Sequence, residues 1–210
     1  MKEVIMLLAV CAFGSANAQV SFKPGVKAGY SASTVTGMGG EYRNNFYLGL
    51  YGNLKLTRIY NMQFEMMYLR QGVDNIQSYR YDDNTYQYVK GRQGSVPLDY
   101  LSLNLINKFN FDKFSMHVGP GIDFLVSEHT ATNNYNITGG NYYEPLYSHN
   151  NGVDLTFNFG LGYSITENFG IEARMRQGII EPIYSNASIY SDYSANLNRS
   201  FMVGATYTFK

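Results

Sequence analysis

Apolar and polar residues alternate along most of this chain with a period of two, which is typical of β-strands and not of helices. The segment 199–210 shows the pattern clearly, because every second residue from Phe201 to Phe209 is apolar or aromatic. The same alternation predicts eight strands in all, at residues 20–34, 45–57, 59–72, 98–111, 114–127, 152–165, 169–180 and 199–210. No long run has apolar residues at the three-to-four spacing of a helix, so the chain is predicted to be all-β.

The connections between the predicted strands alternate between long and short. Turns of a few residues follow the second, fourth and sixth strands, whereas longer polar segments follow the others. This is the connectivity of bacterial outer-membrane barrels, whose short turns face the periplasm and whose long loops face outside. We therefore predict an eight-stranded antiparallel up-and-down transmembrane β-barrel with short periplasmic turns and long extracellular loops.

The two faces of the predicted strands differ in charge. One face carries residues such as Glu65, Lys108 and Glu172, and the opposite face is almost uncharged. A soluble lipocalin-type barrel would have its apolar face inside, but the connectivity favours a polar lumen and an apolar face in lipid. The residues expected to face lipid include Leu48, Leu50, Phe64, Met66, Leu103, Leu105, Phe157 and Phe159. Aromatic residues expected to form a girdle at the periplasmic strand ends are Tyr60, Phe109, Phe114, Phe169 and Phe209.

The first residues have the pattern of a cleavable secretory signal peptide. Lys2 supplies the positive charge, Val4–Phe13 the apolar run, and Ala16–Ala18 an A-x-A cleavage site. The run is too short to span a membrane as a helix. The predicted organisation is therefore a signal peptide at 1–18 and an outer-membrane barrel domain at 19–210.

Composition and charge narrow the chemistry further. The only cysteine, Cys11, lies within the apolar run, so the exported chain has no thiol; a lipoprotein signal at this cysteine is the alternative. The formal net charge is zero, which argues against nucleic acid as a partner because phosphate binding needs a basic surplus. The partner that the pattern itself predicts is outer-membrane lipid, and the oligomeric state is left open.

Charged side chains on the inward face are predicted to form a charge network in the lumen. Its expected members are Lys27, Glu65, Lys108, His117, Glu172, Arg174 and Arg176. An eight-stranded barrel is just wide enough for side chains to fill, and buried charges must pair, so a polar plug is favoured. A narrow charge-gated pore is the alternative interpretation.

No catalytic, cofactor-binding or metal-binding site is predicted. The histidines His117, His129 and His149 do not share metal-ligand spacing on one strand. Ser127, Glu128 and His129 have the residue types of a hydrolytic triad, but strand alternation sends Glu128 to the opposite face.

The predicted long loops are rich in tyrosine. The candidate contact residues are Tyr79, Tyr81, Tyr86, Tyr88, Tyr142, Tyr143 and Tyr147, interleaved with Asn, Ser, Asp and Gly. Tyrosine with small adaptable residues is typical of binding loops, which indicates a protein or glycan partner outside the cell. The alternative is that these residues belong to strand extensions and an outer aromatic belt.

Two segments resemble a known family. Residues 100–111 read Y-L-S-L-N-L-I-N-K-F-N-F, and residues 114–126 read F-S-M-H-V-G-P-G-I-D-F-L-V. Lys108 and Gly119-Pro120 match the lysine and Gly-Pro of the PorT-like outer-membrane β-barrel family, whereas Asn104 and Asn107 depart from its pattern. The resemblance implies a small outer-membrane barrel, and the namesake of the family takes part in protein secretion.

The function predicted from these observations is non-enzymatic. We expect a membrane-anchored scaffold or binding protein that presents its Tyr/Asn-rich loops, within an envelope or secretion assembly. A small-solute porin is the second interpretation, and a lipid-modifying barrel enzyme is the third.

Overall fold

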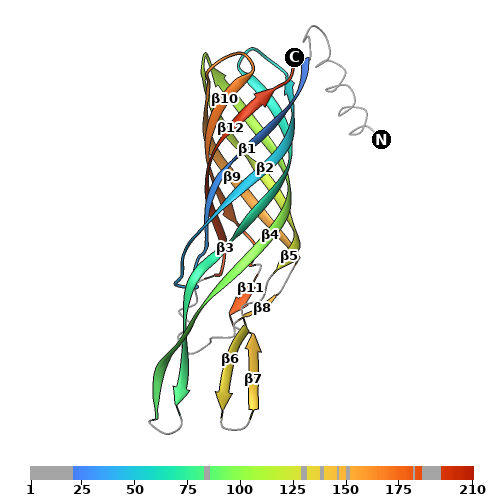
Figure 1. Ribbon diagram of the computed structural model, residues 1–210. Helices are drawn as coiled ribbons and strands as arrows, with labels where there is room; N and C mark the ends of the chain where they lie inside the picture. The colour runs from blue at the N-terminus through green and yellow to red at the C-terminus, as the bar shows by residue number, and fades with distance from the viewer. Residues whose placement is uncertain are drawn as a thin grey trace, which may run out of the picture.

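The computed structural model describes residues 21–82, 86–128, 132–137, 140–145, 147–149, 152–181, 183–185 and 195–210, without the side chains of residues 77–82, 88–93, 128–149 and 183–185. The predicted signal peptide lies outside these residues. Figure 1 shows a tall barrel of tilted strands with both ends of the barrel chain at the same end as the short turns.

Eight antiparallel strands close the barrel, which confirms the predicted fold class. They are β1 (Ser21–Val35), β2 (Glu41–Lys55), β3 (Tyr60–Asp82), β4 (Gln87–Phe111), β5 (Phe114–Glu128), β9 (Val153–Ser164), β10 (Phe169–Gly178) and β12 (Asn198–Thr208). The barrel strands follow one another around the barrel in chain order, and β1 pairs with β12 from Gly25↔Thr208 to Val35↔Asn198. Closure leaves the barrel no exposed edge, which is the condition for a sheet to span lipid.

Short turns connect the strands at one end of the barrel. Asp112 and Lys113 alone separate β4 from β5, and Asp112 has a left-handed φ of 56°, which aspartate tolerates better than most residues. At the turn between β9 and β10, the Thr166 hydroxyl accepts hydrogen bonds from the backbone amides of Asn168 and Phe169. These local interactions fix the short-turn end, which is predicted to face the periplasm.

The long-loop end contains more strand than the sequence predicts. β3 and β4 continue beyond the barrel as a paired ribbon as far as Asp82↔Gln87 (Figure 1). The sequence predicts the segment 73–96 as a polar loop, because most of its residues are polar and its few apolar residues do not alternate regularly. Four further short strands make two small sheets: β6 (Thr132–Ile137) with β7 (Gly140–Pro145), and β8 (Tyr147–His149) with β11 (Ile183–Ser185).

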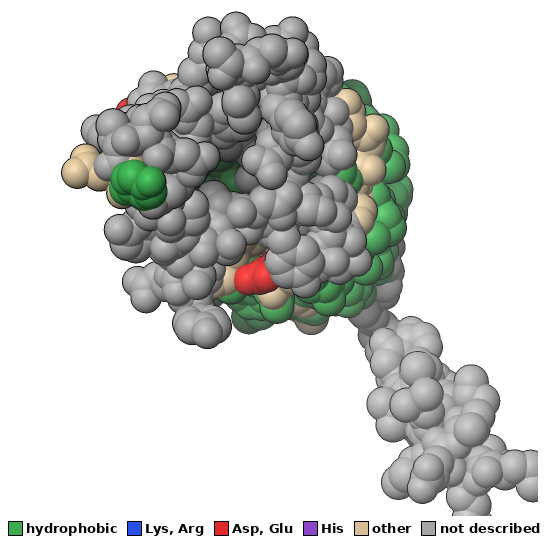
Figure 2. Space-filling model, turned by 90° about the horizontal axis from the view of Figure 1, so that it is seen from below, with side chains coloured by type: hydrophobic (Ala, Val, Ile, Leu, Met, Phe, Trp, Pro, Cys, Tyr) green, Lys and Arg blue, Asp and Glu red, His purple; other side chains and the backbone are tan. Residues whose placement is uncertain are grey.

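The outward face of the barrel wall carries a band of exposed apolar side chains. Leu50 is 53 % exposed and Phe64 is 52 % exposed, although neither lies at the end of its strand. Viewed from the long-loop end, the described wall of the barrel is largely hydrophobic (Figure 2). In the part of the chain that the structure describes, none of the helices is long and apolar enough to cross a membrane.

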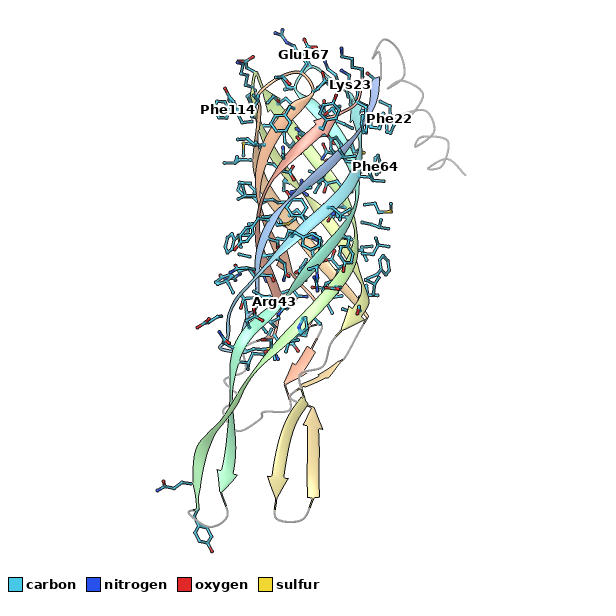
Figure 3. The ribbon with its side chains drawn as sticks, viewed as in Figure 1. Phe22, Lys23, Arg43, Phe64, Phe114 and Glu167 are labelled. Atoms are coloured by element: carbon cyan, nitrogen blue, oxygen red, sulfur yellow. The ribbon has the colours of Figure 1, made fainter. Side chains whose placement is uncertain are left out.

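Polar and aromatic groups bound this band at its two ends. At the long-loop end, Arg70 Nε donates to Asp99 Oδ1 at 3.2 Å and Arg199 Nε donates to Gln177 Oε1 at 2.8 Å. At the short-turn end, the rings of Tyr60 and Phe109, two of the aromatics expected there, are 5.3 Å apart. Figure 3 shows Phe22 and Phe114 near this end and Arg43 near the other. An apolar band between two polar or aromatic boundaries matches the outer surface of a membrane barrel.

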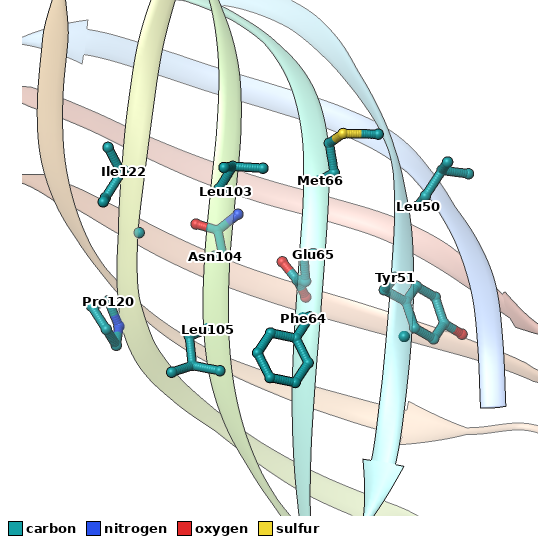
Figure 4. A pocket seen from close by; sticks show the side chains of 12 residues that line it. Leu50, Tyr51, Phe64, Glu65, Met66, Leu103, Asn104, Leu105, Pro120 and Ile122 are labelled. Carbon is teal, nitrogen blue, oxygen red and sulfur yellow. The ribbon is translucent and has the colours of Figure 1, made fainter. Parts of the chain in front are cut away.

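Two rows of outward side chains border a furrow of about 540 Å³ on this band (Figure 4). Leu50, Met66, Leu103 and Ile122 make one row across β2–β5, and Phe64 and Leu105 belong to the other. Gly52 continues the second row without a side chain, and the ring of Phe22 packs against it. The lining is apolar, as expected for a surface covered by acyl chains.

Single cysteines at Leu50, Phe64 and Phe159 are expected to react with a membrane-permeant maleimide and not with a water-soluble one. The expectation follows from their place in the apolar band, and the chain after residue 18 contains no other cysteine. The measurement is labelling in nanodiscs, with a cysteine at the exposed turn residue Lys113 as the control that reacts with both reagents. Strong labelling of Leu50 by the water-soluble reagent would contradict the orientation of the wall.

Candidate functional site

The lumen contains a group of four ions, Lys27, Glu65, Glu172 and Arg174, here called the first ion network. Lys27 Nζ lies 2.8 Å from Glu65 Oε1 and 2.7 Å from Glu172 Oε1. Arg174 Nη1 and Nη2 donate to the two Glu65 oxygens at 2.6 and 2.9 Å. This bidentate pairing is the strong geometry for a guanidinium and a carboxylate. Two cations and two anions therefore neutralise each other inside the barrel.

Strand order brings these four residues together. β1 lies two strands from β3 on one side and two strands from β10 on the other, so Lys27 reaches a carboxylate from each. All four side chains are at least 95 % buried. Gln63 Nε2 adds a further hydrogen bond to Glu65 Oε1 at 2.7 Å. Such burial is tolerable only because each charge has partners.

His117 lies next to the first ion network but is not bonded to it. Its Nε2 is 2.8 Å from Ser115 Oγ, and its Nδ1 is 3.8 Å from Glu172 Oε2, which is too long for a hydrogen bond. Ser, His and Glu are the residue types of a hydrolytic triad, but here Glu172 is bound to Lys27 and Arg174. Ser115 and His117 are also almost fully buried, so the arrangement is one of interior packing.

Arg176 belongs to a separate group, in contrast to the single network that the sequence predicts. Its Nη2 donates to Asp123 Oδ1 at 2.7 Å and also to the hydroxyls of Ser102 and Thr156. Arg176 is two residues further along β10 than Arg174, toward the long-loop end, and Asp123 reaches it from β5, two strands away in the barrel. The prediction estimated the depth of each charge but not its neighbours across the lumen, and therefore omitted Asp123.

Lys108 also differs from the prediction. Its side chain is half-buried near the short-turn end, and it forms no ion pair with any described residue. It lines a polar cavity of about 40 Å³ together with Glu172 and the turn between β9 and β10. Lys108, the predicted network cation nearest to the periplasmic opening, is therefore not a member of the first ion network.

Apolar side chains fill the lumen toward the long-loop end, which the sequence analysis did not predict. This lumen apolar cluster consists of Val35, Tyr47, Met67, Leu69, Val73, Ile76, Val96, Leu98, Tyr100 and Met202. A signal was present, because Met67, Leu69, Leu98 and Tyr100 all occupy the otherwise polar rows of β3 and β4. Polar groups adjoin this cluster, because Asn198 Nδ2 donates to both Tyr100 Oη and Asp154 Oδ2. The ion groups and the apolar cluster together fill the lumen with side chains at more than one height.

The candidate loop tyrosines fall mostly outside the part of the chain whose side chains the structure describes. The backbones of Tyr79, Tyr81 and Tyr88 lie in the β3–β4 ribbon, those of Tyr142 and Tyr143 in β7, and that of Tyr147 in β8. Tyr86, at the tip of the ribbon, is described and is 79 % exposed. Among the described residues, no cluster of three or more His, Cys, Asp or Glu side chains could hold a metal ion.

Similar solved structures are small outer-membrane proteins. They include Ail, the attachment invasion locus protein of Yersinia pestis, in complex with the heparin analogue sucrose octasulfate (14 % identity, TM-score 0.47, 90 % of this chain and 99 % of that chain). Neisserial surface protein A has 13 % identity, a TM-score of 0.48 and coverage of 90 % and 99 %. OprG from Pseudomonas aeruginosa has 11 % identity, a TM-score of 0.48 and coverage of 91 % and 98 %. These distant similarities carry no argument about function.

A protein-family model matches the chain and assigns its family directly. No curated protein matches the chain. The model of the family described as outer membrane protein beta-barrel domain matches residues 17–183, which is well over half of the chain and includes most strands of the closed barrel. With the closed eight-stranded barrel and its apolar outer band, this match shows that the chain belongs to the outer membrane protein beta-barrel domain family and resides in the bacterial outer membrane.

Proposed function

We propose that this protein is a non-enzymatic, non-conducting barrel that anchors extracellular β-hairpins for binding a protein or glycan ligand. The observation that carries the proposal is the filled lumen. The first ion network, the Arg176–Asp123 pair and the lumen apolar cluster all lie inside a barrel of only eight strands. Pores instead favour small inward residues and one dominant sign of charge.

The β3–β4 ribbon supports the second half of the proposal. β2 pairs with β3 only as far as Glu41↔Asp74, and β5 pairs with β4 only as far as Glu128↔Leu98, yet β3 and β4 continue together to Asp82↔Gln87. The ribbon therefore extends past the wall of the barrel, and Tyr86 presents a large amphipathic side chain at its tip. A setting in a secretion assembly, which the resemblance to PorT-like barrels implies, stays a prediction.

Purified protein is expected to remain silent in planar lipid bilayers, without single-channel steps. The physical reason is that an ion would have to displace paired charges and then cross an apolar level of the lumen. Current recordings at several voltages are the measurement, with a general porin inserted under the same conditions as the positive control. Reproducible steps of uniform size from the folded protein would overturn the non-conducting assignment and favour the small-solute pore.

Shortening the ribbon is expected to abolish ligand binding without unfolding the barrel. Residues 77–93 can be replaced by a two-residue Asn-Gly turn after Ile76, which still pairs with Gly94. The measurement compares which protein and glycan ligands are retained by nanodiscs that carry the intact barrel and by nanodiscs that carry the shortened one. Heat-modifiable gel migration tests that both barrels are folded. Equal retention by the two folded proteins would remove the ribbon from the proposed function.

A further inference from the structure

The periplasmic mouth of the lumen contains an unpaired cation in a cavity, and we propose that it binds a carboxylate group. Lys108 reaches this cavity from β4, where it is paired in register with Asn61 on β3 and His117 on β5. No described carboxylate oxygen lies within 4.0 Å of its Nζ, although every other inward lysine or arginine named above has such a partner. This inference does not depend on the function of the extracellular hairpins.

The charge balance of the lower lumen favours an anion at this position. Lys27 and Arg174 are already neutralised by Glu65 and Glu172, and His117 is bonded to a serine hydroxyl. Lys108 therefore adds one uncompensated positive charge beside a neutral group. A half-buried ammonium without a counter-ion is costly, and an anion from solution would remove that cost.

The cavity has the size and chemistry for one carboxylate group. Its volume of about 40 Å³ corresponds to roughly three water-sized atoms, which is the size of the three heavy atoms of a carboxylate. Gln63, Asn53 and Thr206 line the cavity with Lys108, so hydrogen-bonding groups surround the ammonium. Two carboxylates also line the cavity. Glu172 is bonded to Lys27 and Arg174, which offsets its repulsion of a second anion, and Glu167 is exposed to solvent on the turn between β9 and β10.

The cavity lies at the short-turn end of the lumen, and the rim of this mouth is basic. The first ion network closes the cavity on the side of the lumen, and the β9–β10 turn borders its other side. Exposed charged side chains of the short turns and adjoining strand ends are five cations, Lys23, Lys55, Arg58, Lys113 and Lys210, and two anions, Asp112 and Glu167, so cations outnumber anions. Figure 3 shows Lys23 and Glu167 at this end. A basic rim raises the local concentration of anions.

Formate is the probe that tests the site, since it has three heavy atoms and fits the cavity. A ligand of this size is limited to about millimolar affinity, so the titration should extend to about 100 mM. In urea unfolding followed by circular dichroism, sodium formate is expected to raise the midpoint of the wild-type protein. Sodium methanesulfonate at equal ionic strength, which is too bulky for the cavity, should not. Saturation-transfer NMR should show contact between formate and the protein.

Lys108→Met is expected to abolish both effects, whereas Lys23→Met at the exposed rim should keep them. Heat-modifiable gel migration establishes that each variant is folded. A formate response that is equal in wild type and Lys108→Met would overturn the site. No response in wild type would overturn it too, and would indicate that the Lys108 ammonium is satisfied by amide oxygens such as Asn61 Oδ1, which is buried without a partner.

A second arm separates two sources of the carboxylate. N-acetylglycine has the same carboxylate at the end of a peptide-like chain. A Lys108-dependent response to both compounds would support the site with the end of a periplasmic peptide as its natural occupant. A response to formate alone would support it with a free small acid as the occupant.

Discussion

Replacing Arg174 by methionine is expected to lower the free energy of unfolding by about 3–5 kcal/mol, which is the usual cost of removing one partner from a buried ion group. Glu65 would lose two charge-assisted hydrogen bonds, of 2.6 and 2.9 Å, and would share Lys27 with Glu172 as the only remaining cation of the network. One net negative charge would then be buried in the lumen. The measurement is urea unfolding in lipid vesicles followed by circular dichroism.

The double variant Glu65→Gln with Arg174→Met is expected to lose less than the sum of the two single variants, because it leaves a balanced Lys27–Glu172 pair. Arg43→Met is the matched control. The Arg43–Asp74 pair also has a 2.6 Å contact, but its side chains are 22 % and 32 % exposed, so the loss should be about 0–1 kcal/mol. Additive losses in the double variant would show that Glu65 and Arg174 are energetically independent.

The sequence could predict the barrel because alternation and loop length are local properties. A strand that is lipid-facing on one side and polar on the other displays its faces directly, as β9 does from Val153 to Tyr163. Strand ends defined by tight turns, such as Asp112-Lys113, could also be predicted from the sequence. The β3–β4 ribbon could not be predicted in this way, because its sequence is mostly polar and backbone pairing leaves no regular apolar alternation in it.

Lumen partners depend on relations that the sequence does not contain. Strand order, stagger and side-chain reach decide which charges pair inside the barrel. They pair Arg174 with Glu65 and Arg176 with Asp123. The lumen apolar cluster was in principle detectable, since Leu69 and Leu98 are apolar on rows assigned to a polar interior. Treating every inward row as polar along its full length concealed it. The barrel interior is ionic near the periplasm, and near the loops it combines apolar side chains with buried polar ones such as Asp154 and Asn198.

Leu50→Arg is expected to destabilise the folded protein by about 2–4 kcal/mol, because the substitution places a charge on the lipid face near the midplane of the bilayer. Leu50 lies in the apolar row between Leu48 and Gly52 on β2, and its neighbours across the strands are Val26 and Met66. These surroundings offer no carboxylate to pair with the guanidinium. Urea unfolding in vesicles measures the loss, and folding efficiency should fall with it.

Phe22→Arg is the control for depth. Phe22 is 62 % exposed on the same outward surface but pairs with Leu54, close to the end of β2 and to the short turn. An arginine there can reach the headgroups and water, so its cost should be about 0–1 kcal/mol. Equal losses at the two positions would mean that hydrocarbon does not cover the wall at Leu50, and a small loss at Leu50 alone would place that face against another protein surface. The predicted ordering, large at Leu50 and small at Phe22, follows from burial in lipid and from nothing in the interior of the barrel.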